Sequence, residues 1–390
     1  MTFLMYGAGS IGRGFIGPLF AAAGYEVVFV DIDRRVVDAM NARREYKFTI
    51  AADPPYDIAV RGIRAIDGAD RQAVIDAIAS CDFMATALGA AVLQKVAPLI
   101  ADGFSQRVKA GGGPLNILIC ENLKDAAPAL RGWLTEHLPA GGAALLGERC
   151  GLVETAIGRM IPPAVRNDAD PLHLTVEEYG FLPVDRDAFI GEPPAADALV
   201  PYSPFAFYEE RKLYMHNMGH AVCAYLGARY GCETIAQAVS NPYIRLFTQS
   251  AMTESAAMLS IKYGVPFARI FDHAEDLLAR FGNVALGDTC ERVGRDPMRK
   301  LRAGDRLSGA LAQCLAHGVF PAFIALGYAA ALRNVTDDAA RAEEIARAEG
   351  RLDERHIALV MKLYDAYQLP EQGLLAAVER LKGGLRGKII

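Results

Sequence analysis

The chain has 390 residues, 52% of them hydrophobic, which is long enough for two domains with cores of their own. Its formal net charge of -5 excludes the broad basic surface that nucleic acid or an anionic membrane would need. We therefore expect neither nucleic acid nor a membrane as partner, and any site for an anionic small-molecule substrate must be a local cluster of Arg and Lys.

The cysteines and the apolar runs indicate the compartment. Seven cysteines, an odd number without a C-x-x-C pair, are typical of reduced core thiols. The N-terminus enters a predicted strand without a basic leader, and the most apolar late run, residues 318–332, contains Pro321 and is too short to span a bilayer. We expect a cytoplasmic protein.

A glycine-rich loop follows the first apolar run, residues 2–6, and precedes a helical pattern over residues 16–23. The loop reads G-x-G-x-x-G, and a strand before it and a helix after it are the context that a dinucleotide fingerprint requires. Its glycines permit a tight turn and a close approach of the pyrophosphate to the helix N-terminus. The predicted cofactor-binding residues of this loop are Gly7, Ala8, Gly9, Ser10, Ile11, Gly12 and Arg13.

The second predicted strand, residues 26–30, ends in Asp31. An acidic side chain at this point can accept hydrogen bonds from the ribose hydroxyls and would repel a 2′-phosphate, so the sequence favours NAD over NADP. Arg34 and Arg35 follow closely and are the opposing indication.

Strands and helices continue to alternate as far as residue 120. Strands are predicted over residues 58–60, 81–87 and 115–120, and helices over residues 71–78 and 91–100. The last strand is apolar throughout, as a central parallel strand would be, and Asn122 follows it. Because ligands bind beyond the carboxyl ends of strands in open α/β sheets, Asn122 is predicted to lie at the reacting part of the cofactor. The alternative is an amide that caps the next helix.

The hydrophobic period changes to 3.6 residues from about Tyr202 onward, which predicts a helical second half. Helices are expected over residues 206–230, 234–263, 266–281, 311–332, 339–349 and 353–367. The sequence thus predicts an α/β N-terminal Rossmann-type domain, residues 1–195, followed by a mostly α-helical C-terminal domain, residues 196–390.

One predicted helix carries an unusual polar face. With helical spacing, this face holds Glu209, Lys212, Leu213, His216, Asn217 and His220. A solvated face is normally built from Glu, Lys and Arg, whereas this one has a single lysine, an amide and two imidazoles; a plain solvated face is the alternative. Neither an H-E-x-x-H motif nor a tetrahedral Cys and His spacing occurs, so we expect no metal site.

A basic segment lies further along the chain, between residues 291 and 302. It holds Arg292, Arg295, Arg299 and Lys300 around a glycine and a proline. Arginine forks on an irregular loop suit a phosphate or a carboxylate. A solvated charged turn is the alternative interpretation.

Several of these segments together resemble the polyol-specific long-chain dehydrogenases. The resemblance rests on the N-terminal glycine loop, on Cys120-Glu-Asn122, on Lys212 with Asn217 and His220, and on residues 291–301. It spans essentially the whole chain and implies zinc-independent hydride transfer with NAD. Within this family, the short N-terminus favours the branch that interconverts mannitol 1-phosphate and fructose 6-phosphate.

The resemblance also implies roles for individual residues. Lys212 would be the general base for alcohol oxidation and, as the ammonium, the general acid for ketone reduction, for which its pKa must fall below ~10.4. Asn122 and Asn217 would donate hydrogen bonds to the developing alkoxide. His220 would orient substrate hydroxyls, and Glu209 would pass the proton to solvent or only pair with Lys212. Candidates for the substrate phosphate are Arg295, Arg299 and Lys300.

Three other interpretations are open. The substrate could be a free polyol or a hexuronate ketone of the same family, since such enzymes carry similar basic segments. A relation to the 6-phosphogluconate and hydroxyacid dehydrogenases is disfavoured by Asp31 and the Cys-Glu-Asn segment. A non-catalytic NAD sensor would not need lysine, asparagine and histidine on one helix face. The resemblance suggests a monomer, and the apolar helical half leaves a dimer open.

Overall fold

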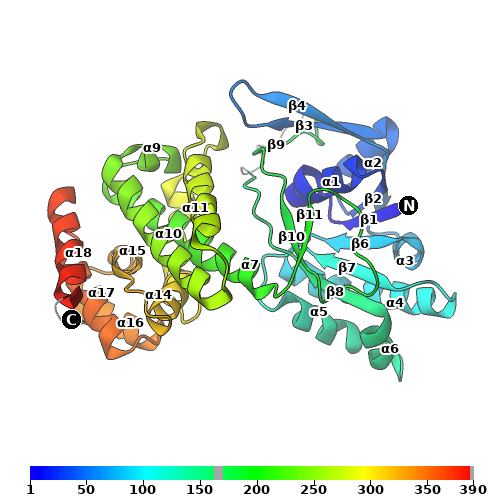
Figure 1. Cartoon of the computed structure of the whole chain (residues 1–390). Helices are drawn as coiled ribbons and strands as arrows, with labels where there is room; N and C mark the ends of the chain where they lie inside the picture. The colour runs from blue at the N-terminus through cyan, green and yellow to red at the C-terminus, as the bar shows by residue number, and fades with distance from the viewer. Residues whose placement is uncertain (162–169, 387–390) are drawn as a thin grey trace. The chain divides into compact units, whose positions relative to one another are not determined.

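A computed structural model describes residues 1–161 and 170–386 of the chain. The chain divides into two compact units, Met1–Ala206 and Phe207–Ile390. Figure 1 draws the first from blue to green and the second from green to red. The domain boundary predicted between residues 195 and 196 lies before β11 (Leu199–Tyr202), the last strand of the first unit.

Six parallel strands form the main sheet of the first unit, in the order β5-β2-β1-β6-β7-β8. They are β1 (Thr2–Tyr6), β2 (Glu26–Asp31), β5 (Ile63–Asp67), β6 (Phe83–Thr86), β7 (Leu115–Ile119) and β8 (Cys150–Glu154). The order is that of a doubly wound Rossmann sheet, and it reverses direction between β1 and β6. Ligands bind such sheets at the carboxyl ends of the strands beside this switch point, which is where the glycine loop begins.

Both faces of the sheet are buried, and β1 shows why its residues are apolar without alternation. Phe3 and Met5 pack on one side against α1 (Gly17–Ala22) and α2 (Arg34–Arg43), and Leu4 and Tyr6 pack on the other. The helices on this other side are α3 (Arg71–Ser80), α4 (Ala90–Lys109), α5 (Ala126–Thr135) and α6 (Gly142–Arg149). Figure 1 shows α3 to α6 along one side of the sheet.

Smaller strands complete the first unit. The predicted strand over residues 58–60 is part of β4 (Tyr56–Arg61), but it does not join the main sheet. It pairs antiparallel with β3 (Glu45–Ile50), which also pairs with β9 (Thr175–Val176). β10 (Leu182–Asp185) pairs with β11.

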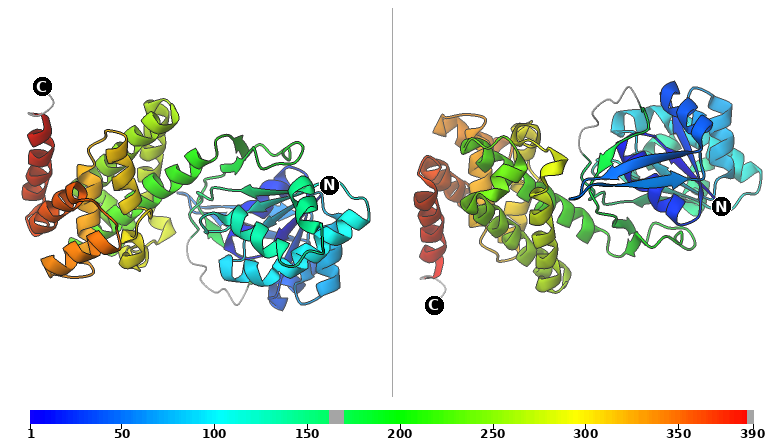
Figure 2. Two further views of the ribbon diagram at one scale, coloured as in Figure 1. Left: turned by 90° about the horizontal axis from the view of Figure 1, so that it is seen from below. Right: turned by 90° about the horizontal axis from the view of Figure 1, so that it is seen from above.

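The second unit is helical, which confirms the predicted fold class. Its α-helices are α7 (Ala206–Arg211), α8 (Met218–Arg229), α9 (Ile235–Ser240), α10 (Pro242–Tyr263), α11 (Phe267–Phe281), α12 (Cys290–Gly294), α13 (Pro297–Leu301), α14 (Ser308–Ala316), α15 (Ala322–Arg333), α16 (Ala339–Ala348), α17 (Glu354–Ala366) and α18 (Glu371–Arg386). In both views of Figure 2, α18, drawn in red, lies at the outer edge of this unit.

Two predicted helices are each two helices in the structure. The helix predicted over residues 234–263 breaks at Asn241, whose side chain accepts hydrogen bonds from the first turn of α10, with Pro242 at the first helical position. The helix predicted over residues 311–332 breaks at Gly318, which has a φ of +74°, and Pro321 precedes α15. The apolar period alone does not show these breaks.

Candidate active site

Two glycines shape the loop after β1 by contacts that no other residue allows. Gly7 has a φ of +109°, and a Cβ there would come within 2.4 Å of the Ala87 carbonyl oxygen. A Cβ on Gly12 would come within 2.0 Å of the Gly7 carbonyl oxygen. The helix that begins in the loop is therefore drawn close to the end of β1, as the dinucleotide fingerprint requires.

Ala8, in the middle of this loop, is held on both sides. The Asp31 carboxylate accepts hydrogen bonds from the backbone N–H of Ala8 at 2.8 Å and of Asp33 at 2.9 Å. The buried Arg13 donates from Nε to the Ala8 carbonyl oxygen at 2.6 Å and from Nη1 to the Pro171 carbonyl oxygen at 2.6 Å. Arg13 thus braces the loop from inside the protein, whereas Asp31 is partly exposed at the end of β2.

Arg34 and Arg35, the two arginines that favoured NADP, each form an ion pair with a carboxylate. Arg34 lies 2.7 Å from Asp67, and Arg35 lies 2.8 Å from Asp33. These exposed pairs are weak, but they place a carboxylate next to each guanidinium. Together with Asp31, they leave an acidic surrounding at the end of β2, and the parallel sheet with its glycine loop fits NAD.

The two polar side chains of the Cys-Glu-Asn segment, Glu121 and Asn122, differ in their burial. Glu121 is buried and accepts the backbone N–H groups of Leu88 at 2.9 Å and Gly89 at 2.7 Å, just before α4. Asn122 is exposed beyond the end of β7. It does not cap α5, because the N-cap residue of that helix is Asp125.

The helix that carries Lys212 is interrupted by a π-helical segment. Between α7 and α8, residues Lys212–Asn217 form the π-helix η2. Such a segment adds a residue to a turn and changes which side chains share a face, and it is frequent at functional sites. Lys212, Asn217 and His220 are partly buried, whereas Glu209 is exposed.

His216, which the helical spacing puts on the same face, is buried, and its ring lies 6.2 Å from that of His220. Burial, with a further contribution from Arg280, lowers the pKa of His216 well below its usual value. A neutral, buried imidazole at this position is a packing residue, and its ring lies 5.9 Å from that of Phe281.

His220 is held on two sides. Its ring stacks on Phe281 at 4.6 Å with an interplanar angle of 15°. Its Nε2 atom lies 3.3 Å from Oδ2 of Asp288. Asp288 also accepts two hydrogen bonds from Arg292, at 2.6 and 2.5 Å.

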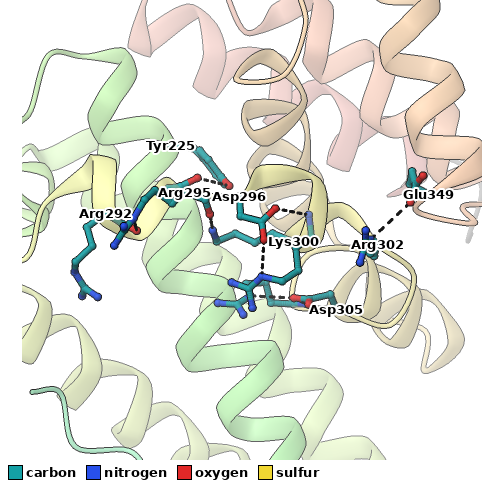
Figure 3. A network of polar contacts seen from close by, with 11 residues as sticks. Tyr225, Arg292, Arg295, Asp296, Lys300, Arg302, Asp305 and Glu349 are labelled. Carbon is teal, nitrogen blue, oxygen red and sulfur yellow. Dashed lines mark hydrogen bonds and ion pairs between the residues drawn. The ribbon is translucent and has the colours of Figure 1, made fainter. Parts of the chain in front are cut away.

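A basic pocket of about 330 Å³ opens beside His220. Figure 3 shows Arg292, Arg295, Asp296 and Lys300 gathered around the turn between α12 and α13. The lining residues are His220, Arg292, Val293, Arg295, Asp296, Arg299, Lys300 and Arg306. The structure therefore brings all three predicted phosphate ligands together with His220. We call this cavity the basic pocket.

Three of the five cations of the basic pocket have a carboxylate partner. Arg299 pairs with Asp296 at 3.1 Å, Arg306 with Asp305 at 3.0 Å, and Arg292 with Asp288. Within the described residues, no carboxylate lies within ion-pairing distance of Arg295 or Lys300. Two positive charges are thus left over in the basic pocket.

Lys300 lies at the base of this cluster and is only 2% exposed. Its ammonium donates a hydrogen bond to the backbone carbonyl of Arg295. Burial, assisted by Arg306 and Arg299, lowers the pKa of Lys300 to about 8. At neutral pH the side chain is therefore still mostly charged, and it loses its proton as the pH rises above about 8.

Two arginines of this region were not among the predicted phosphate ligands, and one acidic residue was missed altogether. Arg292 and Arg306 line the basic pocket, and their place in or beside the basic segment was the available signal. Asp288 contacts His220 from 68 positions further along the chain, and no pattern in the sequence joins the two.

In the part of the chain that the structure describes, no group of three His, Cys, Asp or Glu residues is placed to hold a metal ion. Nor does any helix in residues 1–161 and 170–386 have the length and apolarity needed to cross a membrane.

The fold and the glycine loop define a Rossmann-type dinucleotide-binding protein with a helical second domain. Residues 1–197 match the mannitol dehydrogenase Rossmann domain, and residues 205–380 match the mannitol dehydrogenase C-terminal domain. The chain therefore belongs to the mannitol dehydrogenase family, a family of polyol oxidoreductases.

Two solved structures share the fold over nearly the whole length. One is Pseudomonas fluorescens mannitol 2-dehydrogenase in a ternary complex with NAD and D-mannitol, with a TM-score of 0.73 at 16% identity, covering 98% of this chain and 94% of that one. The other is D-sorbitol dehydrogenase in substrate-free form, with a TM-score of 0.76 at 16% identity, covering 97% and 95%. At this identity the likeness is one of fold.

Proposed function

We propose that the chain is an NAD-dependent mannitol-1-phosphate 5-dehydrogenase, which converts D-mannitol 1-phosphate and NAD⁺ reversibly into D-fructose 6-phosphate, NADH and a proton. The observation that carries this proposal is the basic pocket, with two uncompensated positive charges next to His220. Family membership supports the polyol chemistry, and the basic pocket supports the phosphate.

The charge of the basic pocket suits a phosphate better than the alternatives. A phosphate monoester carries about -1.5 to -2 charges at neutral pH. Arg295 offers a planar fork for two of its oxygens, and Lys300 offers a point charge. A hexuronate carboxylate would neutralise only one of these charges, and a free polyol would neutralise none.

The acid–base chemistry is assigned to the helix of α7, η2 and α8. Lys212 would take the proton of the alcohol during oxidation and return it to the ketone during reduction. Asn217, five residues on, and Asn122 of the Rossmann domain would donate hydrogen bonds to the alkoxide. His220 would hold a neighbouring substrate hydroxyl, and the exposed Glu209 would exchange the proton with water.

The proposed cofactor site is the glycine loop of the Rossmann domain. The N-terminus of the helix that begins in this loop would hold the pyrophosphate, and Asp31 would accept hydrogen bonds from the ribose hydroxyls. When bound, NAD supplies or accepts the hydride at C4 of its nicotinamide.

A substrate panel tests the proposal. NADH oxidation is measured with fructose 6-phosphate, fructose and a hexuronate ketone under identical conditions. We expect kcat/KM to be highest for fructose 6-phosphate, with fructose at least 100-fold lower, on the order of two charge-assisted hydrogen bonds lost. A preference for fructose would overturn the phosphate assignment, and a preference for the hexuronate would reassign the basic pocket to a carboxylate.

The pH dependence of substrate binding is a second prediction. The KM for fructose 6-phosphate should be lowest between about pH 6 and 8, because the substrate phosphate gains a proton below about pH 6. Above pH 8, Lys300 loses its proton, since its pKa is about 8, and KM should rise. In the variant Lys300→Met the alkaline rise should disappear and KM should be high throughout. A flat alkaline side in the native protein would remove Lys300 from the phosphate site.

Cofactor choice gives a third prediction. Asp31→Ser should raise the KM for NADH by about tenfold, the size expected for losing a hydrogen bond to a charged group, and should improve the use of NADPH. Without the negative charge of Asp31, the nearby Arg34 would be able to bind a 2′-phosphate. Asp38→Ser, an exposed acid on α2, is the control and should change neither KM. Unchanged NADH kinetics in Asp31→Ser would contradict the ribose assignment.

A further inference from the structure

Asp288 contacts His220 but does not line the basic pocket. Its carboxylate is shared between Nε2 of His220, at 3.3 Å, and the guanidinium of Arg292. Nε2 of His220 is shielded from solvent and makes no hydrogen bond of regular geometry in this structure. A buried imidazole nitrogen is stabilised by a hydrogen-bond partner, and Asp288 is the acid that faces it.

We propose that Asp288 is a positioning residue that acts through His220: its carboxylate accepts a hydrogen bond from Nε2–H, which keeps the proton on Nε2 and leaves Nδ1 as the acceptor for a substrate hydroxyl. This inference rests on the proposed function, since the hydroxyl belongs to the polyol substrate of the same site. In a neutral imidazole, the bond made by one nitrogen decides which tautomer is present, so the carboxylate selects what the other nitrogen can do.

The loop that carries Asp288 is tied to the start of α9. The backbone N–H of Ile235 donates to the Asp288 carbonyl oxygen at 2.9 Å, and the N–H of Cys290 donates to the Glu233 carbonyl oxygen at 2.9 Å. Thr234 and Thr289 form a β-bridge between these two bonds. The carboxylate is therefore fixed by tertiary structure on one side of His220, while Phe281 fixes the plane of the ring.

The charge of Asp288 fits this role. Burial favours its neutral form, but the adjacent His220 and the hydrogen bonds from Arg292 outweigh burial and keep the pKa of the Asp288 carboxyl below its usual value. The carboxylate is thus an acceptor at both oxygens. The Asp288 carboxylate also neutralises the charge of Arg292, so that Arg295 is the arginine left to bind the phosphate.

A double-mutant cycle tests the inference. Asp288→Asn, His220→Ala and the double variant are compared in the reduction of the panel ketose that the native protein reduces fastest. We expect Asp288→Asn to lower kcat by about tenfold or more, the loss typical for a carboxylate behind a functional histidine, with the KM for NADH unchanged. In the His220→Ala background the same change should cost less than twofold, because its target is gone.

The matched control is Asp305→Asn, which removes the carboxylate paired with Arg306 in the same cluster without contacting His220. Its effect should multiply with that of His220→Ala, as independent effects do. If the effects of Asp288→Asn and His220→Ala also multiply, Asp288 does not act through His220, and the inference is overturned.

A readout without turnover separates this inference from the proposed function. Imidazole ¹⁵N NMR of histidine-labelled protein, assigned with His220→Ala, reports which ring nitrogen carries the proton. The expected result is an Nε2–H tautomer of His220 in the native protein and its loss in Asp288→Asn. A native Nδ1–H tautomer would overturn the inference even if fructose 6-phosphate is the substrate. Conversely, an Nε2–H tautomer in a protein that prefers fructose supports Asp288 while the phosphate proposal fails.

Discussion

Replacing Lys212 by alanine is expected to lower kcat for fructose 6-phosphate reduction by about 10²- to 10⁴-fold, the range that a positioned acid–base group contributes. The hydride donor is unaffected by this change, but the alkoxide no longer receives a proton from the protein. The measurement is kcat by NADH absorbance, with the Kd for NADH measured separately and expected to stay constant.

A control and a rescue make this result specific. Lys362→Ala removes an exposed lysine of α17 and should leave kcat unchanged. Small primary amines added to Lys212→Ala should restore part of the rate, with the best rescue from amines whose pKa lies near the assay pH. A Lys212→Ala protein with nearly native kcat would contradict the acid–base assignment of Lys212, whereas NADH binding without turnover in the native protein would favour the sensor interpretation.

Replacing Arg295 by glutamine is expected to raise the KM for fructose 6-phosphate by roughly 10- to 150-fold, which corresponds to about 1.5–3 kcal/mol for hydrogen bonds to a charged group. Arg295 has no carboxylate partner among the described residues, so its guanidinium is the one most available to a phosphate. The turnover of fructose should be unchanged, because a free ketose has no group at this position.

The matched control for Arg295 is Arg302→Gln. Arg302 belongs to the same basic stretch, but its side chain is 65% exposed, lies 3.9 Å from Glu349 and does not line the basic pocket (Figure 3). Its replacement should change KM by less than twofold. If both variants weaken fructose 6-phosphate binding equally, the effect is one of general charge, and the assignment of Arg295 fails.

Most of the Rossmann unit could be predicted because its signals act over few residues. Gly7 and Gly12 are required by contacts within the loop itself, and Asp31 ends the strand that the apolar run had indicated. The structure confirmed the fold class that these local signals predicted. The hairpin of β3 and β4 was not foreseen, because strand periodicity does not say which sheet a strand joins.

In the helical unit, the polar residues of a helix could be found but not which of them are buried. A uniform period of 3.6 puts His216 on the face of Lys212 and His220, and its ring lies 6.2 Å from that of His220, but His216 is buried whereas the other two are partly exposed. Burial depends on the packing of other helices around this one, and the π-helical turn over Lys212–Asn217 also has no simple sequence signature.

The sequence by itself determined the chemistry that this protein has at its disposal: a dinucleotide loop with Asp31, a helix bearing Lys212, Asn217 and His220, and a basic segment. Each is a local arrangement of residue types. Only the tertiary structure decided which of these groups lie together. It placed Asp288 against His220 and closed the basic segment into a pocket with two uncompensated charges. Burial and contacts between distant residues depend on the packing of the whole unit, which no local pattern encodes.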